Sequence, residues 1–206
     1  LGKSFERVDD FTYKIELYDN IYDTAGNHLT ASDVLWSFDT AKEPKKRNLK
    51  CIESFTADDD FHLTLVLNSN DVGLFERAMF QTHVVTQKAY EDSGDEMKTQ
   101  AVATGPYMIT QWDEGSKIVL EKNPDYWAKD IDRHNYQWQN VDVIEFDIIP
   151  EAVQQLTGLD TGKIDIIPST TFDKAAPYMP GGEKSEGYVV YDKFEATQFM
   201  QFNCNE

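Results

Sequence analysis

Cysteine and histidine are scarce in this chain of 206 residues. Its two cysteines, Cys51 and Cys204, are too few for a disulfide framework and lack a zinc-binding spacing. One disulfide between them stays open, although two buried thiols are the arrangement that cysteine burial favours. The four histidines are scattered and form no H-E-x-x-H motif. The sequence therefore indicates no metal site.

Basic residues are also few, because 19 lysines and arginines stand against 37 aspartates and glutamates, for a net charge of −18. Nucleic acids and anionic membranes require positive potential, so the charge argues against both as partners. No hydrophobic run approaches the length of a membrane span. A charged-then-apolar leader is missing as well, and we expect a mature, trimmed or excised chain.

Motifs of familiar catalytic chemistry are missing too. There is no G-x-S-x-G elbow for a serine nucleophile and no glycine-rich loop for phosphate. The 37 carboxylates form many pairs by chance, so nearness in the sequence does not identify an acid–base couple. The sequence therefore predicts a protein that is not an enzyme and carries no cofactor.

A hairpin pattern is present in residues 103–127. Two apolar strands, 107–112 and 118–120, flank the polar turn 113–115. Asn123-Pro124 ends the second strand, because proline removes a ladder donor. Strict alternation would place Tyr107, Ile109 and Gln111 on one side and Met108, Thr110 and Trp112 on the other.

Residues before this hairpin predict a strand and a helix. Residues 11–17 alternate apolar and polar side chains, as a half-buried strand does. A helix is expected to begin at Thr30, with Asp33 completing an arrangement like a capping box. Its buried face would hold Val34, Phe38 and Ala41.

Two more strands are expected at residues 51–55 and 61–67, joined by the three aspartates 58–60. An aspartate triplet also suggests calcium. The loop lacks the glycine and the distal glutamate of an EF-hand, so an ordinary acidic hairpin turn is the preferred interpretation. A short apolar helical face is expected over residues 74–79.

Residues after the central hairpin suggest a β-α-β unit. Residues 141–149 are strongly β-prone, a helix follows with Gly162 at its end, and residues 163–167 form a short predicted strand. Strand, helix and strand in this order favour a parallel sheet. The helix would bury Ala152, Leu156 and Leu159. A small helix with a loop at 172–187 and final strands at 188–191 and 197–204 complete the expected elements.

Several phrases resemble one protein family. The central stretch reads TGPY, a tryptophan five residues on, a turn, and a strand that ends in EKNP before DYW. The phrase GNHLTASDV, from Gly26 to Val34, and the frame of Gln154, Gly162 and Asp165 occur in matching order. Together they resemble the family 5 extracellular solute-binding proteins, the oligopeptide- and dipeptide-binding components of ABC importers.

The resemblance implies a type II periplasmic-binding-protein-like α/β fold, with mixed sheets and flanking helices. The chain would be partial, comprising one lobe plus a small subdomain. Residues 1–98 would form the smaller subdomain and residues 99–198 the middle part of the first lobe. Residues 199–206 would be the crossover strand towards a second lobe that lies beyond Glu206.

A function is implied as well. Members of the family bind short peptides by closure of two lobes and deliver them to ABC transporter permease subunits, without catalysis. The resemblance implies a monomer outside the cytoplasm, in the periplasm or at the cell surface, touching the membrane only through a lipid anchor outside this chain. Two alternatives stay open. One is a relative that binds nickel, haem or a sugar, and the other is a non-transport interaction module.

Ligand-binding residues are expected near the end of the chain. With period two, Phe199, Gln201 and Asn203 share one strand face that would line a cleft. The resemblance places Phe194, Phe199 and Gln201 in the peptide cleft. In the best-known relatives the acidic residue that fixes a peptide's amino terminus lies beyond this chain's last residue. The isolated chain is therefore expected to bind peptide weakly or not at all.

Overall fold

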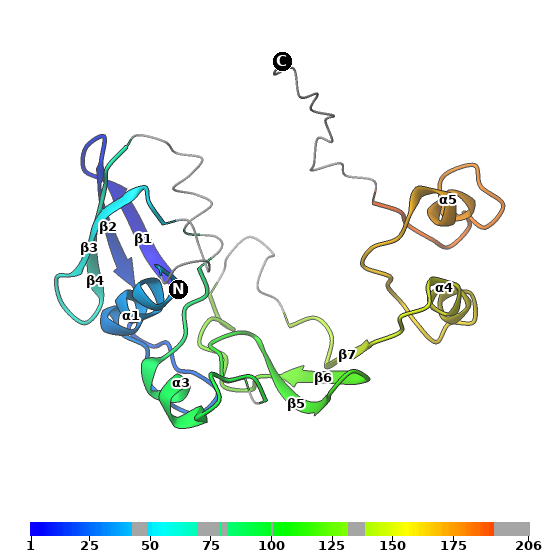
Figure 1. The fold of residues 1–206 in the computed structure, drawn as a ribbon, viewed down its shortest axis with the longest axis horizontal. Coiled ribbons are helices and arrows are strands. Elements are labelled where there is room, and N and C mark those ends of the chain that lie inside the picture. Colours follow the sequence, from blue (N-terminus) through cyan, green and yellow to red (C-terminus); the bar gives the residue numbers. More distant parts are fainter. Residues whose placement is uncertain (43–48, 70–78, 80–81, 100, 132–138, 192–206) are drawn as a thin grey trace, which may run out of the picture. The chain divides into compact units, whose positions relative to one another are not determined.

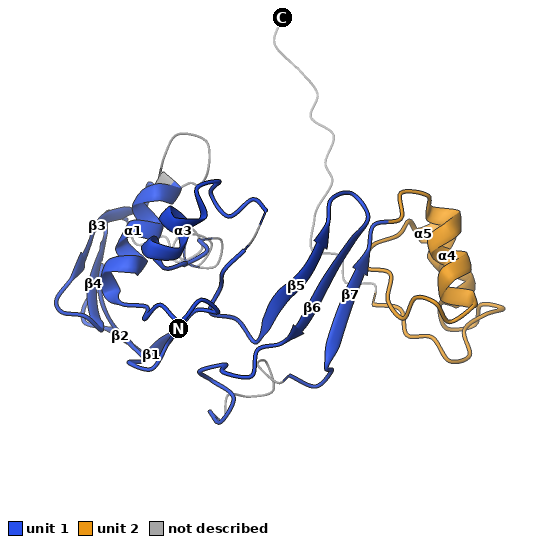
Figure 2. Ribbon diagram, turned by 90° about the horizontal axis from the view of Figure 1, so that it is seen from below, with its two compact units in different colours: residues 1–148 blue, residues 149–206 orange. Residues whose placement is uncertain are grey.

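In the computed structural model the chain forms two compact units, Leu1–Ile148 and Ile149–Glu206 (Figures 1 and 2). The structure describes residues 1–42, 49–69, 79, 82–99, 101–131 and 139–191. Within these ranges no helix is both long and apolar enough to cross a membrane. The domain boundaries expected after residues 98 and 198 stay predictions. Most of the helix expected at 74–79 lies outside the described residues.

A four-stranded antiparallel sheet is the centre of the first unit (Figure 1). Its strands follow one another in the order β1 (Gly2–Arg7), β2 (Thr12–Leu17), β4 (His62–Leu67) and β3 (Ile52–Ala57). The three strands predicted for this region are confirmed as β2, β3 and β4. β1 is an exposed edge strand that the sequence did not indicate, because it lacks apolar alternation.

The acidic segment between β3 and β4 is a hairpin turn, as predicted. Oδ1 of Asp59 accepts the backbone N–H groups of Phe61 and His62, each at 2.9 Å. Both bonds lower the pKa of Asp59, and the bond from the Phe61 N–H contributes most. The carboxylate thus stabilises its own turn in the way aspartate commonly does.

The hydrophobic core lies on one face of this sheet. Alternate residues of β2 and β4 are buried there: Tyr13, Ile15, Leu17, Leu63, Leu65 and Leu67. Helix α1 (Ala31–Lys42) covers this face with Val34 and Phe38 buried and Ala41 packed beside them, as predicted. Each large apolar side chain stabilises the fold by about 1.5–3 kcal/mol when fully buried. Cys51 is part of this core, whereas Cys204 lies outside the described residues.

A second, three-stranded antiparallel sheet has the order β5 (Tyr107–Asp113), β6 (Lys117–Lys122) and β7 (Val143–Asp147). The predicted hairpin and the strand predicted at 141–149 are confirmed. The predicted sides hold for Tyr107, Met108 and Ile109, but those of Gln111 and Trp112 are wrong, because the register shifts between Ile109 and Gln111. This bulge makes Thr110 an extra residue and breaks the period of two.

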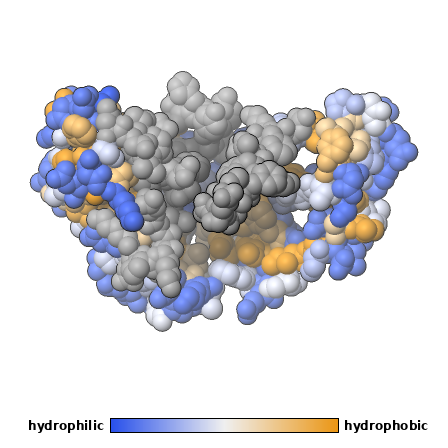
Figure 3. Space-filling view, turned by 45° about the horizontal axis from the view of Figure 1, so that its top comes forward, coloured by the Kyte–Doolittle hydropathy of each residue, from blue (hydrophilic) through white to orange (hydrophobic). Residues whose placement is uncertain are grey.

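The bulge brings two rows of apolar side chains onto one face of the second sheet. Directly paired residues point to the same face of a sheet. The pairings create two apolar rows across the strands, Trp112–Ile118–Phe146 and Ile109–Leu120–Ile144. The opposite face carries Lys117, whose Nζ lies 2.7 Å from Glu145 and 3.4 Å from Asp147. Phe146 is 53 % exposed, and hydrophobic patches interrupt the hydrophilic surface in Figure 3.

The second unit contains helix α4 (Ala152–Asp160), followed by α5 (Phe172–Ala175) and the 3₁₀ turn η1 (Ala176–Tyr178), as predicted. Gly162 ends α4 with φ at +69°. The N–H of Gly162 donates to Leu159 O at 3.1 Å and that of Lys163 donates to Gly158 O at 2.8 Å. This pair of bonds is a Schellman motif, which satisfies carbonyls that a helix end leaves unpaired.

The strands predicted at 163–167 and 188–191 are absent, so the β-α-β prediction is wrong. The amides of Lys163 and Ile164 both donate to Gly158 O within the helix cap, and a ladder would need them. Ile166 is 77 % exposed. Both sheets in the described part of the chain are antiparallel. The last predicted strand, 197–204, lies outside the described residues.

Candidate functional site

The four residues predicted to line a ligand cleft, Phe194, Phe199, Gln201 and Asn203, lie outside the described residues. Their roles stay predictions. The structure does describe the two phrases on which the family resemblance depends. It also contains, in the first unit, a pocket of about 450 Å³.

The phrase TGPY…NPDYW closes the base of the β5–β6 hairpin. The backbone N–H of Asn123 donates to Pro106 O at 2.9 Å, and its Nδ2 donates to Gly105 O at 3.2 Å. Nε1 of Trp127 donates to Thr104 O at 3.0 Å. Asn123 and Thr104 are buried, where polar groups need partners. We call these five residues the clasp.

The clasp also attaches the hairpin to the rest of the first unit. The carbonyl of Trp127 accepts Nδ2 of Asn20 at 3.3 Å, across 107 positions of sequence. The Trp127 ring lies 5.3 Å from that of Tyr18. Beside the clasp, Thr24 N–H donates to Ala103 O at 3.0 Å. In the described part of the chain, the phrase that carries the resemblance thus connects the hairpin to the N-terminal part of the first unit.

The second phrase, GNHLTASDV, organises two helix N-termini. Oδ2 of Asp33 accepts the N–H of Thr30 at 2.8 Å just before α1, which confirms the predicted cap. Oδ1 of the same carboxylate accepts the N–H of Gln87 at 2.9 Å, at the first residue of α3 (Gln87–Ser93). Thr86 precedes α3 and donates its hydroxyl to buried Asp23. Asp33 therefore stabilises both helices at once.

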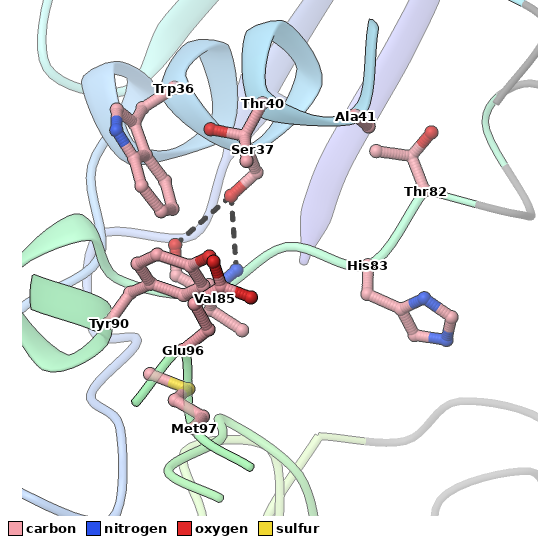
Figure 4. A pocket seen from close by; sticks show the side chains of 10 residues that line it. All are labelled: Trp36, Ser37, Thr40, Ala41, Thr82, His83, Val85, Tyr90, Glu96 and Met97. Carbon is pink, nitrogen blue, oxygen red and sulfur yellow. Dashed lines mark hydrogen bonds between the residues drawn. The ribbon is translucent and has the colours of Figure 1, made fainter. Parts of the chain in front are cut away.

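The pocket lies between α1, α3 and the segments on either side of α3 (Figure 4). Trp36 and Tyr90 form its aromatic wall, with ring centroids 4.9 Å apart at 63°. Ser37 is buried beside them, and its Oγ donates to Val85 O at 3.1 Å and accepts the Val85 N–H at 3.2 Å. The other lining residues are Thr40, Ala41, Thr82, His83, Glu96 and Met97.

The loop after α3 supplies two of these lining residues in an uncommon backbone conformation. Glu96 and Met97 have φ of 60° and 58°, a region that costs L-residues roughly 1–2 kcal/mol each. Ser93 Oγ accepts the Met97 N–H at 3.0 Å, and the carboxylate of Asp95 accepts the Thr99 N–H at 3.1 Å. Side-chain hydrogen bonds thus hold the loop against the pocket.

The loop after α3 carries charged groups next to Glu96 in the sequence. Glu96 lies 3.1 Å from Lys98 Nζ, and this hydrogen-bonded pair raises the pKa of Lys98. The hydrogen bond from Thr99 is the main cause that lowers the pKa of Asp95. Lys98 is therefore cationic and Asp95 anionic at neutral pH.

Among the described residues that line the pocket, the Ser37 hydroxyl has a backbone partner. Oγ of Ser37 contacts the backbone of Val85 rather than an imidazole or a carboxylate. An activated nucleophile would need such a base within hydrogen-bond reach. The residues that the structure describes contain no cluster of acidic, histidine and cysteine side chains fit to hold a metal ion.

Sequence reasoning missed this pocket because it missed α3. Signals for that helix were present, since Thr86 is a good residue to precede a helix and Gly94 ends it with φ at +67°. The meeting of Trp36 with Tyr90 had no local signal. It depends on the packing of two helices that are distant in the sequence.

Solved structures of solute-binding proteins are similar to this chain. The oligopeptide-binding protein AppA from Bacillus subtilis, in complex with a nonapeptide, has a TM-score of 0.68 at 19 % identity, covering 80 % of this chain and 34 % of that one. DppA from Helicobacter pylori with the peptide STSA has a TM-score of 0.62 at 25 % identity, covering 80 % and 36 %. NikZ from Campylobacter jejuni with Ni(L-His) has a TM-score of 0.66 at 21 % identity, covering 80 % of this chain and 33 % of NikZ.

These similarities show the α/β fold of type II periplasmic binding proteins, as the sequence predicted. Residues 1–206 match the family described as bacterial extracellular solute-binding proteins, family 5 Middle, and the chain belongs to this family. Proteins of this family are extracytoplasmic, and they bind solutes rather than act as enzymes.

Curated relatives are much longer than this chain. The uncharacterized protein YejA of Escherichia coli K12 is 25 % identical over 133 residues, which cover 61 % of this chain and 22 % of YejA. AppA of Bacillus subtilis 168 is 20 % identical over 193 residues, covering 86 % and 34 %. The chain therefore spans about a third or less of these relatives.

Proposed function

We propose that the protein containing this chain captures short peptides outside the cytoplasm and delivers them to the permease subunits of an ABC transporter. The observation that carries this proposal is the family match over residues 1–206. Peptide-binding proteins among the relatives and structural neighbours support the choice of ligand. Binding would proceed by lobe closure, with no covalent step.

Phe194, Phe199, Gln201 and Asn203 would contact the ligand. An extended peptide offers main-chain donors and acceptors for Gln201 and Asn203, while the phenylalanines would form pockets for its side chains. Residues 1–98 would be the smaller subdomain, 99–198 the middle of the first lobe and 199–206 the crossover strand. The protein would be a monomer, attached to the membrane only by a lipid anchor outside this chain, in the periplasm or at the cell surface.

A non-peptide solute is the second candidate ligand. NikZ with Ni(L-His) and AgaA with agropinic acid, from an Agrobacterium strain, reach TM-scores of 0.66 and 0.68 against this chain. The peptide-bound DppA reaches 0.62. Fold similarity therefore does not separate peptides from metal complexes or opines, and the ligand itself must be identified.

Native mass spectrometry of the intact protein, purified gently and then denatured, would identify the ligand that it carries. Co-purified short peptides are the expected result. A nickel complex, a haem, a sugar or an opine would keep the family and overturn the peptide assignment. An empty protein that also ignores a peptide library would contradict the transport function and favour an interaction module.

Variants of the final strand would test the site. F199A is expected to weaken peptide binding about tenfold, because buried aromatic side chains often contribute strongly to binding affinity. M200A is the matched control, since period two points Met200 to the other face. Calorimetric titration of both variants provides the measurement. Equal effects of the two changes would contradict the assignment of Phe199 to the cleft.

A further inference from the structure

We propose that the pocket between α1 and α3 is a second ligand site, which binds a small organic amine with an aromatic body. All of its described lining residues belong to the first unit, and none belongs to the strand expected to line the peptide cleft. Its volume of about 450 Å³ is within the range of small-molecule sites, roughly 300–1,000 Å³. The site is independent of the identity of the transported solute.

The aromatic side chains that line the pocket favour a ligand with an aromatic ring. Trp36 and Tyr90 meet edge to face, and Met97 and Val85 add apolar surface (Figure 4). Aromatic rings favour stacked or edge contacts with a further ring, and a methionine sulfur contacts ring edges favourably. The Ser37 hydroxyl forms both of its hydrogen bonds with the backbone of Val85, so it holds the lining in place rather than binding the ligand.

The charge of the lining favours a cationic ligand. Glu96 is the one carboxylate among the described lining residues, and the faces of Trp36 and Tyr90 attract cations. The net charge of −18 increases the concentration of cations near the chain. Lys98 already pairs with Glu96 at 3.1 Å, so an amine would compete with its ammonium for that carboxylate.

Backbone strain in the lining gives independent support. Glu96 and Met97 are consecutive non-glycine residues with left-handed φ, and Ser93 and Asp95 hydrogen-bond the surrounding amides. Such strain persists only where the surroundings impose it, and it concentrates at ligand sites. Here it places one carboxylate and one thioether at the same pocket.

Tryptamine, indole and indole-3-propionate are matched probes, because they share a ring and differ in charge. Titration of the intact protein, followed by ligand-observed NMR, is expected to give the order tryptamine, indole, indole-3-propionate. E96Q should weaken tryptamine binding about threefold, as loss of an exposed ion pair does. W36L should weaken it roughly tenfold, because a cation–π face is lost. K98Q should strengthen it, since the competing ammonium is gone.

E114Q is the control for Glu96, because it removes one exposed carboxylate at the β5–β6 turn with the same change in net charge. Equal effects of E96Q and E114Q would overturn the assignment. So would equal affinity for the three probes, the absence of binding at millimolar tryptamine, or displacement of tryptamine by a library of short peptides.

Discussion

Asp160 is the residue that ties the second unit together. Its Oδ1 accepts the Tyr178 hydroxyl at 2.8 Å, and its Oδ2 accepts Lys184 Nζ at 2.6 Å. The same ammonium lies 5.3 Å above the Tyr178 ring, and Tyr188 meets that ring edge-on at 5.0 Å. The hydrogen bond from Lys184, and then that from Tyr178, lower the pKa of Asp160. One carboxylate thus links α4 to the chain after η1.

This geometry predicts a loss of order in acid. Because the folded pKa of Asp160 lies below its ordinary value of 3.8, the ionised form stabilises the folded unit above that pH. The stabilisation is then lost as the pH falls from 3.8 through the folded pKa. The Lys184 N–H donates to Pro177 O at 2.8 Å. Its hydrogen exchange, corrected for the intrinsic effect of pH, should become faster as this stabilisation is lost.

D160N should exchange fast already at neutral pH, because a neutral amide holds the Lys184 ammonium weakly. D165N is the control, since Asp165 is exposed and this substitution also removes one negative charge, five positions after Asp160 in the sequence. Identical exchange in D160N and the parent would show that Asp160 does not organise this unit.

Asp33 gives a second prediction at the scale of one residue. D33A removes the acceptor for the N–H groups of Thr30 and Gln87, so two helix starts lose a partner together. The free energy of unfolding should fall by about 1–2 kcal/mol, the cost of a lost helix cap. Urea denaturation provides the measurement. D92A, which removes only the exposed pair with Lys88 on α3, should cost about 0.5 kcal/mol or less.

At the scale of the element, the second sheet presents an apolar face on which Trp112 and Phe146 stay exposed. The bulge at Thr110 aligns two rows of apolar side chains there, whereas the other face carries the ion pairs of Lys117 around the buried Val119. A sheet with one apolar face needs a second layer over that face. We therefore expect further chain of the intact protein to cover Phe146 and not Val143.

Two substitutions on one strand test this expectation. Phe146 and Val143 are similarly exposed here, at 53 % and 48 %, but lie on opposite faces of β7. In the intact protein F146A should lower the free energy of unfolding by about 3 kcal/mol, as large-to-small changes in a core do. V143A should cost about 1 kcal/mol or less. Small, equal costs in denaturant titrations would mean that the apolar face stays open to solvent.

At the scale of the whole molecule, peptide capture should require more than these 206 residues. The chain spans about a third of AppA, and lobe closure needs two lobes. We expect the isolated chain to show no saturable peptide binding at micromolar concentrations, whereas the intact protein binds. Circular dichroism would first establish that the isolated chain is folded. Micromolar affinity of the folded, isolated chain would contradict this expectation.

The sequence alone determined the local elements. Alternation identified β2, the Thr30–Asp33 pair marked the start of α1, and the Asn-Pro signal marked the end of the β5–β6 hairpin. These features depend on neighbours in the chain, so local chemistry is sufficient to specify them. The quoted phrases were also sufficient to identify the family.

Tertiary structure decided which residues meet. Asn20 with Trp127 and Trp36 with Tyr90 are contacts between distant positions, and no local pattern encodes them. The bulge at Thr110 reversed the expected faces of Gln111 and Trp112, because register depends on the partner strand. The strand expected at 163–167 did not form, since the helix cap uses its first amides. Local sequence limits what a segment can become, and competition for hydrogen bonds and buried surface selects among those forms.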